Sequence, residues 1–152
     1  MGAIHTRLRR RKVSVAAAES CTGGLLAVVL TAHGGSSDYF KGGAVVYSNE
    51  AKTIFADVPA DLIHGHGAVS SVVAGALARG ARARLGAKIG LGITGIAGPG
   101  GATPGKKIGL TYVAVDSDEH SAVKKYQWPY DREGNRLASV GAALDLLEKA
   151  IE

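Results

Sequence analysis

Residues 34–52, GGSSDYFKGGAVVYSNEAK, decide how the chain is expected to be organised, because they pass from a turn through a strand into a helix. Two glycine pairs permit sharp turns, and the apolar run 44–47 after the second pair predicts a short buried strand. Ser48 or Asn49 is a suitable N-cap for a helix that follows at once. Lys52 would then lie one turn into that helix, where its amine can point back toward the turn.

A similar strand-to-helix unit precedes this stretch. Residues 13–18 predict a buried strand, and the polar, glycine-ended turn 19–24 leads into an apolar helix. Turns of this kind direct backbone N–H and hydroxyl groups beyond the strand end, where open α/β sheets usually bind ligands. Ser20 and Thr22 are therefore candidate site residues, although helix capping explains Ser20 equally well. We expect Cys21 to be a small buried filler.

The remaining pattern completes an α/β fold with a mixed sheet. The other predicted elements are a helix at 59–62, a helix at 72–85 capped by Ser70, strands at 88–94, 108–115 and 121–128, and a helix at 137–151. The strands 108–115 and 121–128 are joined by a short turn, so we expect them to be antiparallel. Many glycines and alanines with few aromatic residues suit close packing of helices on a sheet.

A glycine-rich loop, 95–105, follows the strand 88–94. The segment 90–95, GLGITG, matches the pattern GxGxxG, but its glycines fall inside the predicted strand and no helix follows at once. We therefore do not interpret it as a dinucleotide-binding fingerprint. The loop either brings backbone amides close to a ligand or only forms a turn.

Positive charge is concentrated in a few places. The formal net charge is +5, and the run 7–12, RLRRRK, supplies much of the excess. No aromatic platform or nucleic-acid module accompanies the run, so an exposed helix face is the simpler interpretation and nucleic acid is not expected as a partner. Arg132 and Arg136 are four residues apart and share a helix face, which suits a phosphate clamp; a solvated face is the alternative.

Length and composition limit the other classes of function. A chain of 152 residues corresponds to one domain, 1–152. No apolar stretch is long enough for a leader or a membrane span, so we expect a cytoplasmic protein with no membrane partner. A single cysteine excludes an internal disulfide. His64 and His66 lack carboxylate or thiol partners at ligand spacing, so we expect them in a loop and not at a metal.

Six motifs occur in an order that points to a known family. They are AESCTGG (18–24), GSS (35–37), YSNEAK (47–52), GAVS (67–70), TGIAGPGG (94–101) and DRxxxR (131–136). Together they closely resemble the C-terminal domain of the CinA competence/damage-inducible family, over nearly the whole chain. The resemblance implies a three-layer α/β/α fold. It also implies a nicotinamide-nucleotide amidase, which hydrolyses the carboxamide of nicotinamide mononucleotide to nicotinate mononucleotide and ammonia.

The resemblance further implies a serine–lysine dyad, which falls on Ser37 and Lys52 with Tyr47 assisting. An amide is a poor electrophile, so the serine needs a base, and a lysine serves as one only when its amine is neutral. We expect Ser20 and Thr94 to provide donors for the developing oxyanion. Ser20 is also a candidate nucleophile in its own right.

Substrate contacts are expected from the two turns and the last helix. By the same resemblance, Arg132 or Arg136 would bind the 5′-phosphate, which the guanidinium fork fits well. The expected substrate-binding residues are Ser20, Thr22, Gly23, Thr94, Gly95, Arg132 and Arg136. The chemistry requires no metal and no organic cofactor, the partner is a small nucleotide, and a homodimer is a further expectation. The alternatives are an inactive nucleotide-binding protein of the same fold and a regulatory partner in DNA uptake or repair.

Overall fold

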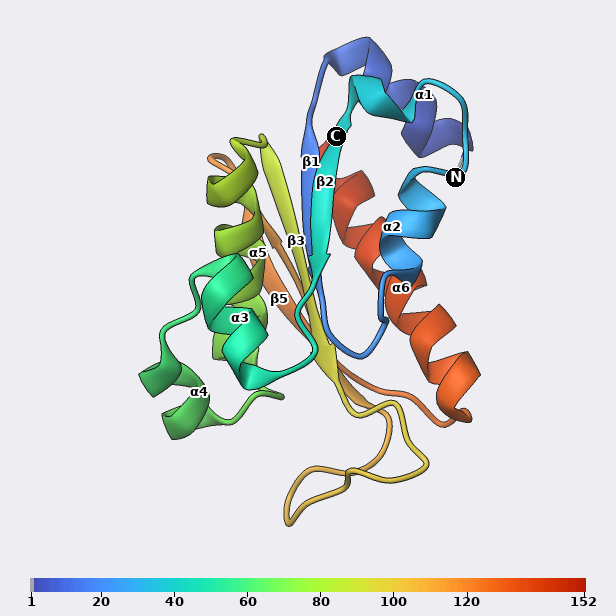
Figure 1. The fold of residues 1–152 in the computed structure, drawn as a ribbon. Helices are drawn as coiled ribbons and strands as arrows, with labels where there is room; N and C mark the ends of the chain where they lie inside the picture. The colour runs from blue at the N-terminus through green and yellow to red at the C-terminus, as the bar shows by residue number, and fades with distance from the viewer. Residues whose placement is uncertain (1) are drawn as a thin grey trace.

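The computed structural model describes residues 2–152 and contains one five-stranded sheet (Figure 1). Its strands are β1 (Val15–Glu19), β2 (Phe40–Val45), β3 (Ile89–Gly95), β4 (Leu110–Asp116) and β5 (Ser121–Gln127). They lie in the order β2-β1-β3-β4-β5. β1 is parallel to β2 and β3, whereas β4 is antiparallel to β3 and β5 is antiparallel to β4. The predicted mixed sheet is therefore confirmed.

Helices cover both faces of the sheet and complete three layers (Figure 1). One face carries α1 (Gly2–Arg11), α2 (Leu25–Leu30) and α6 (Arg132–Ala150), and the other carries α3 (Asn49–Ala56), α4 (Ala60–His66) and α5 (Ser71–Leu85). The basic run lies on α1, which buries Ile4 and Leu8 and leaves most of its arginines exposed. Within residues 2–152, none of the helices has the length and apolar character that crossing a bilayer needs.

Side-chain caps fix where three of the helices begin. Ser48, Ser70 and Asp131 each accept a hydrogen bond from a backbone N–H in the first turn of α3, α5 and α6. Loss of such a cap costs about 1 kcal/mol. The cap at Ser48 starts α3 soon after β2 ends, and this places Lys52 one turn into the helix, as predicted.

Two local predictions are wrong. Gly42 and Gly43 lie inside β2 and not in a turn before it. Gly43 packs against β1, where an added Cβ would lie 3.0 Å from the carbonyl oxygen of Ala17. His64 and His66 belong to the last turn of α4 and not to a loop. Within residues 2–152, no group of three or more potential metal-ligating side chains is assembled.

α5 packs directly on β3 because two glycines leave room for its backbone. A Cβ on Gly90 would lie 1.9 Å from the carbonyl oxygen of Ala78, and one on Gly92 would lie 2.4 Å from that of Ala74. The glycines of the segment 90–95 therefore have a packing explanation.

Gly80 of α5 makes the same kind of contact with α3. A Cβ on Gly80 would lie 1.7 Å from the carbonyl oxygen of Ala56, so the backbone must move to accept one. We expect Gly80→Ala to lower the free energy of unfolding by about 1–3 kcal/mol in urea denaturation. Gly141→Ala is the matched control, because Gly141 is exposed on α6 and has no atom within 4 Å of the Cβ position. Equal effects of the two substitutions would contradict this explanation.

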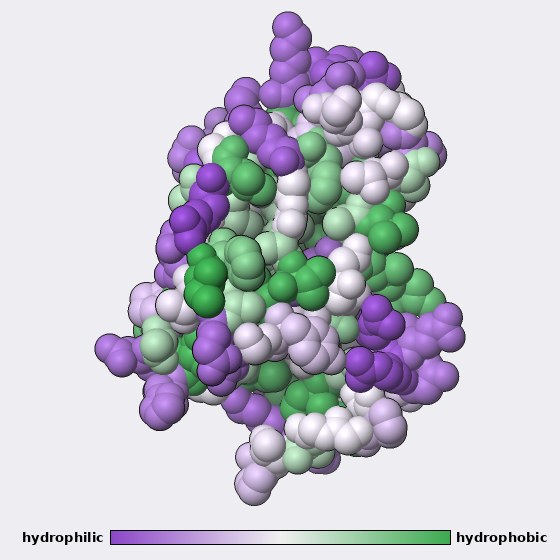
Figure 2. Space-filling view, viewed as in Figure 1, coloured by the Kyte–Doolittle hydropathy of each residue, from purple (hydrophilic) through white to green (hydrophobic). Residues whose placement is uncertain are grey.

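The two edges of the sheet differ in character. β5 exposes Lys124 and Lys125, which discourage pairing with a further strand. Beside β2 lies a hollow of about 220 Å³ that includes the exposed side chains of Phe55 and Leu85. Figure 2 shows hydrophobic surface gathered over the middle of the face on which β2 lies in Figure 1. β2 is thus the apolar edge of the sheet, and the homodimer stays a prediction.

Candidate active site

The three parallel strands, β1, β2 and β3, have their carboxyl ends at the same end of the sheet. Glu19, the last residue of β1, is paired with Val45 of β2 and with Ile93 of β3. Three segments leave the sheet at this end: the turn 20–24, the segment that leads into α3, and the loop after β3. Ligands of open α/β sheets usually bind just beyond the carboxyl ends of the strands.

Lys52 makes several hydrogen bonds at this end of the sheet. It is only 1% exposed, and no carboxylate within residues 2–152 lies at ion-pair distance from it. Its Nζ lies 3.2 Å from the Oγ of Ser20. The amine also donates to the carbonyl oxygens of Val46, Tyr47 and Ser48, at 2.9, 3.1 and 3.4 Å. The segment between β2 and α3 therefore folds around the amine.

Burial favours the neutral form of this amine. Desolvation lowers the pKa of Lys52 below its ordinary value, and the charge of a Cys21 thiolate would act in the opposite direction. Burial also raises the pKa of Cys21 to about 11, so the thiol stays protonated at neutral pH. A neutral amine has two N–H donors, so it keeps two of the three carbonyl contacts and gains one lone pair that can accept the Ser20 proton. This is the state that a general base requires.

The structure does not bring Ser37 to Lys52, and the predicted dyad is corrected on this point. Ser37 lies in a short 3-10 helix, η1 (Ser36–Asp38), just before β2 begins, whereas Lys52 follows the end of β2. β2 lies between Ser37 and Lys52, and its six residues correspond to a strand length of about 20 Å. The serine beside Lys52 is Ser20, which was the alternative nucleophile.

Ser20 lies in a turn that is fixed at both ends. The carboxylate of Glu19 is 2% exposed and accepts hydrogen bonds of 2.9 Å from two N–H groups in the first turn of α2. Gly23 and Gly24 have φ values of 59° and 99°, which few other residues tolerate. Ser20 caps no helix. Sequence reasoning missed the role of Glu19, although an acidic residue close to a helix start is a known signal for it.

Arg136 reaches the back of the same turn from α6. Its Nη2 donates to the carbonyl oxygen of Thr22 at 3.1 Å, and a Cβ on Gly23 would lie 3.4 Å from Nη2. The Nε of Arg136 and the Oγ1 of Thr22 are both buried, with no hydrogen-bond partner among the described residues. Thr22 and Gly23 thus contact Arg136 and support the turn that carries Ser20.

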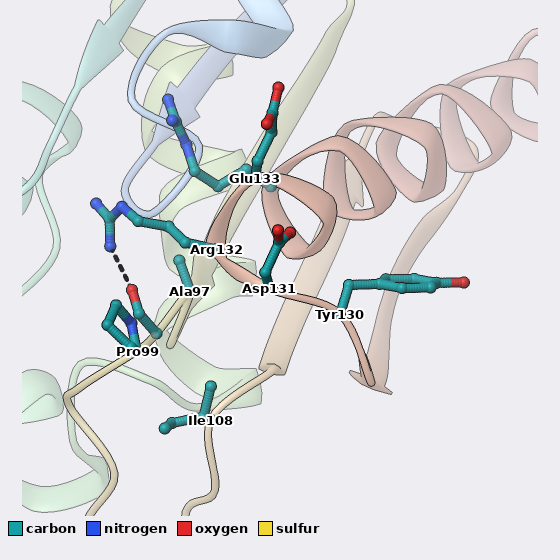
Figure 3. A pocket seen from close by; sticks show the side chains of 9 residues that line it. Ala97, Pro99, Ile108, Tyr130, Asp131, Arg132 and Glu133 are labelled. Atoms are coloured by element: carbon teal, nitrogen blue, oxygen red, sulfur yellow. Dashed lines mark hydrogen bonds between the residues drawn. The ribbon is translucent and has the colours of Figure 1, made fainter.

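Arg132 extends from the start of α6 toward the loop after β3 (Figure 3). Its Nη1 donates to the carbonyl oxygen of Gly98 at 2.8 Å, and its Nη2 donates to the hydroxyl of Tyr47 at 3.2 Å. The Tyr47 hydroxyl therefore meets Arg132, while the backbone carbonyl of Tyr47 meets Lys52. In the described part of the chain, no carboxylate forms an ion pair with Arg132 or Arg136.

The segment before α5 forms a wall opposite these groups. The hydroxyl of Thr94 donates to the carbonyl oxygen of Ala68 at 2.7 Å. Its proton is therefore not available to an oxyanion, contrary to the prediction for this hydroxyl. Lys106 donates to the carbonyl oxygens of Val69 and His66, at 2.7 and 3.2 Å. These bonds hold the wall in place. Sequence reasoning did not find this contact of Lys106.

Comparison with known proteins assigns this arrangement to a family. The family model described as CinA C-terminal domain matches residues 1–151. The chain belongs to the CinA family. A CinA-like protein from Acidobacterium capsulatum is 50% identical over 144 residues, which is 95% of this chain and 35% of the relative. A CinA-like protein from Koribacter versatilis is 51% identical with the same coverage. The chain thus spans about a third of the length of the curated relatives it matches.

Solved CinA structures share the fold. The competence/damage inducible protein CihA from Agrobacterium tumefaciens aligns with a TM-score of 0.94 at 36% identity, over 99% of this chain and 92% of that one. A CinA superfamily protein from Escherichia coli aligns with a TM-score of 0.93 at 30% identity, over 97% and 86%. The α/β fold implied by the resemblance is confirmed.

In this CinA domain, the functional groups line two adjoining hollows. A pocket of about 280 Å³ contains Ser20 and Lys52 together with Thr94 and Gly95. An open hollow of about 720 Å³ contains Arg136 and shares Ala97, Gly98 and Arg132 with the pocket (Figure 3). Cys21 and Ala97 also line the pocket, and the backbone N–H of Ala97 donates to no acceptor within residues 2–152. The site thus combines a serine hydroxyl beside a buried amine with two guanidinium groups that have no carboxylate partner within residues 2–152.

Proposed function

We propose that this CinA domain is an amidase that hydrolyses the carboxamide of a pyridine nucleotide, nicotinamide mononucleotide first, to the carboxylate and ammonia. The observation that carries the proposal is the distance of 3.2 Å between Nζ of Lys52 and Oγ of Ser20, inside a pocket where the lysine has no carboxylate partner among residues 2–152. A serine next to a neutral lysine can attack an amide without a metal.

In the first half of the proposed reaction, Oγ of Ser20 attacks the carbonyl carbon while Lys52 accepts the hydroxyl proton. The carbonyl oxygen becomes an oxyanion, for which the N–H group of Ala97 is available, because it has no acceptor among residues 2–152. A donor of this kind lowers the barrier by about 2.7–4 kcal/mol. Lys52 then gives its proton to the amide nitrogen, the C–N bond breaks, and ammonia leaves an ester on Ser20.

In the second half, water replaces ammonia. Lys52 removes a proton from the water, whose oxygen attacks the ester carbon. The bond to Oγ then breaks and Lys52 returns the proton to Ser20. The sum consumes one water and releases one carboxylic acid, which ionises at neutral pH.

Arg132 and Arg136 are the proposed contacts of the substrate phosphate. Within residues 2–152, their hydrogen bonds go to neutral oxygens, of Gly98, Tyr47 and Thr22. Arginine–phosphate pairs join opposite charges and are frequently bidentate, which contacts to neutral oxygens do not offer. Arg132 borders both hollows, so a ring bound beside Ser20 could extend its ribose phosphate toward the arginines.

The test is ammonia release by the purified chain with chelator present. We expect turnover of nicotinamide mononucleotide, and a lower kcat/KM for nicotinamide riboside and free nicotinamide, which lack the phosphate. An equal kcat/KM for the substrates with and without the phosphate would contradict the assignment of Arg132 and Arg136 to phosphate binding. No turnover of any of the three would contradict the amidase.

A further inference from the structure

Asn49 is an exposed polar side chain that lines the pocket and makes no side-chain hydrogen bond to residues 2–152. It is the first residue of α3 and lines the same pocket as Ser20 and Lys52. The N-cap of α3 is Ser48, so the helix does not need the Asn49 side chain. The hydroxyl, amine and guanidinium groups that share the pocket each make a hydrogen bond: Ser20, Tyr47, Lys52, Thr94 and Arg132.

A carboxamide that enters this pocket needs an acceptor for its NH2 group. Two N–H donors lose their water there, and a buried donor without a partner is costly. Several backbone carbonyls of the pocket wall already accept bonds from side chains: those of Tyr47, Ala68 and Val69. The side-chain oxygen of Asn49 accepts no hydrogen bond from the described part of the chain.

We propose that Asn49 determines specificity for the carboxamide, by accepting a hydrogen bond from the substrate NH2 group through Oδ1. The inference rests on the proposed amidase function. A carboxylate product presents an oxygen where the substrate presents this nitrogen, so it meets an acceptor and binds less well. Asparagine can reduce this penalty only in part, by turning its own NH2 group toward the product and losing the orientation that suits the substrate. Aspartate cannot, because an ionised carboxylate only accepts.

Binding to the Ser20→Ala protein tests this inference without turnover. Calorimetry would compare nicotinamide mononucleotide with nicotinate mononucleotide. Adding Asn49→Asp should raise the Kd ratio of product to substrate by about tenfold or more, and adding Asn49→Ala should raise the substrate Kd by about tenfold. An aspartate in the first turn of a helix favours that helix, so folding is retained. Glu50→Gln is the control, because Glu50 neighbours Asn49 but does not line the pocket.

The outcomes separate the two proposals. An unchanged Kd ratio in Asn49→Asp, with substrate still bound, would overturn the role of Asn49 and leave the amidase standing. A shift of similar size and opposite sign in Glu50→Gln would overturn it too, because that variant removes a negative charge where Asn49→Asp adds one, and the effect would then be one of charge near α3. Failure of the Ser20→Ala protein to bind nicotinamide mononucleotide would overturn both.

Discussion

Ser20→Ala should lower kcat for ammonia release from nicotinamide mononucleotide by about 10⁴-fold or more, because it removes the attacking oxygen of the proposed reaction. Ser37→Ala should leave kcat and KM unchanged, since Ser37 lies before the amino end of β2, away from the carboxyl ends where Ser20 and Lys52 lie. Steady-state ammonia release by the two purified variants measures the difference.

The comparison has its own controls. Both serines are small, so both variants should unfold at the same urea concentration as the wild type, and Ser20→Ala should still bind the nucleotide. Activity retained in Ser20→Ala and lost in Ser37→Ala would return the nucleophile to the position first expected from the sequence.

Lys52→Met should lower kcat by about 10²–10⁴-fold, because it removes the general base while keeping a long apolar side chain. Lys52→Arg should lose as much, since a guanidinium stays protonated and cannot accept the Ser20 proton. The pair separates a base from a mere positive charge. Activity retained in Lys52→Arg would show that charge alone is needed.

The pH dependence of the wild type follows from the same group. Turnover requires the neutral amine, so kcat/KM should rise with pH and level off above the pKa of Lys52. Burial lowers that pKa, which places the midpoint below the ordinary lysine value of about 10.4. Between the two values the unfolded chain binds more protons than the folded one, so the free energy of unfolding should also rise with pH there. Lys52→Met should lack this rise.

Much of the fold was predictable because its signals are local. Ser48 and Ser70 cap the helices expected of them, and the turn after β1 ends in two glycines with positive φ. The alternation of strands and helices also indicated an α/β sheet with an antiparallel pair. These features depend on residues close together in the chain, so the sequence alone contains them.

The pairing at the site was predicted only in part, because it depends on strand direction. Ser37 is nearer to Lys52 in sequence than Ser20 is. However, β2 separates Ser37 from Lys52 and places the two residues at opposite ends of the strand. The bonds of Thr94 and Lys106 go to backbone carbonyls, which have no signature in a sequence. The place of Asn49 in the pocket likewise required the path of the chain out of β2.

The hydrogen bond from Arg136 to Thr22 joins residues 114 positions apart. On the ribosome, Ser20 and Lys52 emerge early, whereas both arginines of α6 emerge near the end of this stretch. The residues of the proposed catalytic pair are therefore available before those that support the turn of Ser20 and that would hold a phosphate. Under the proposed mechanism, turnover begins only after the last helix has been synthesised and has docked.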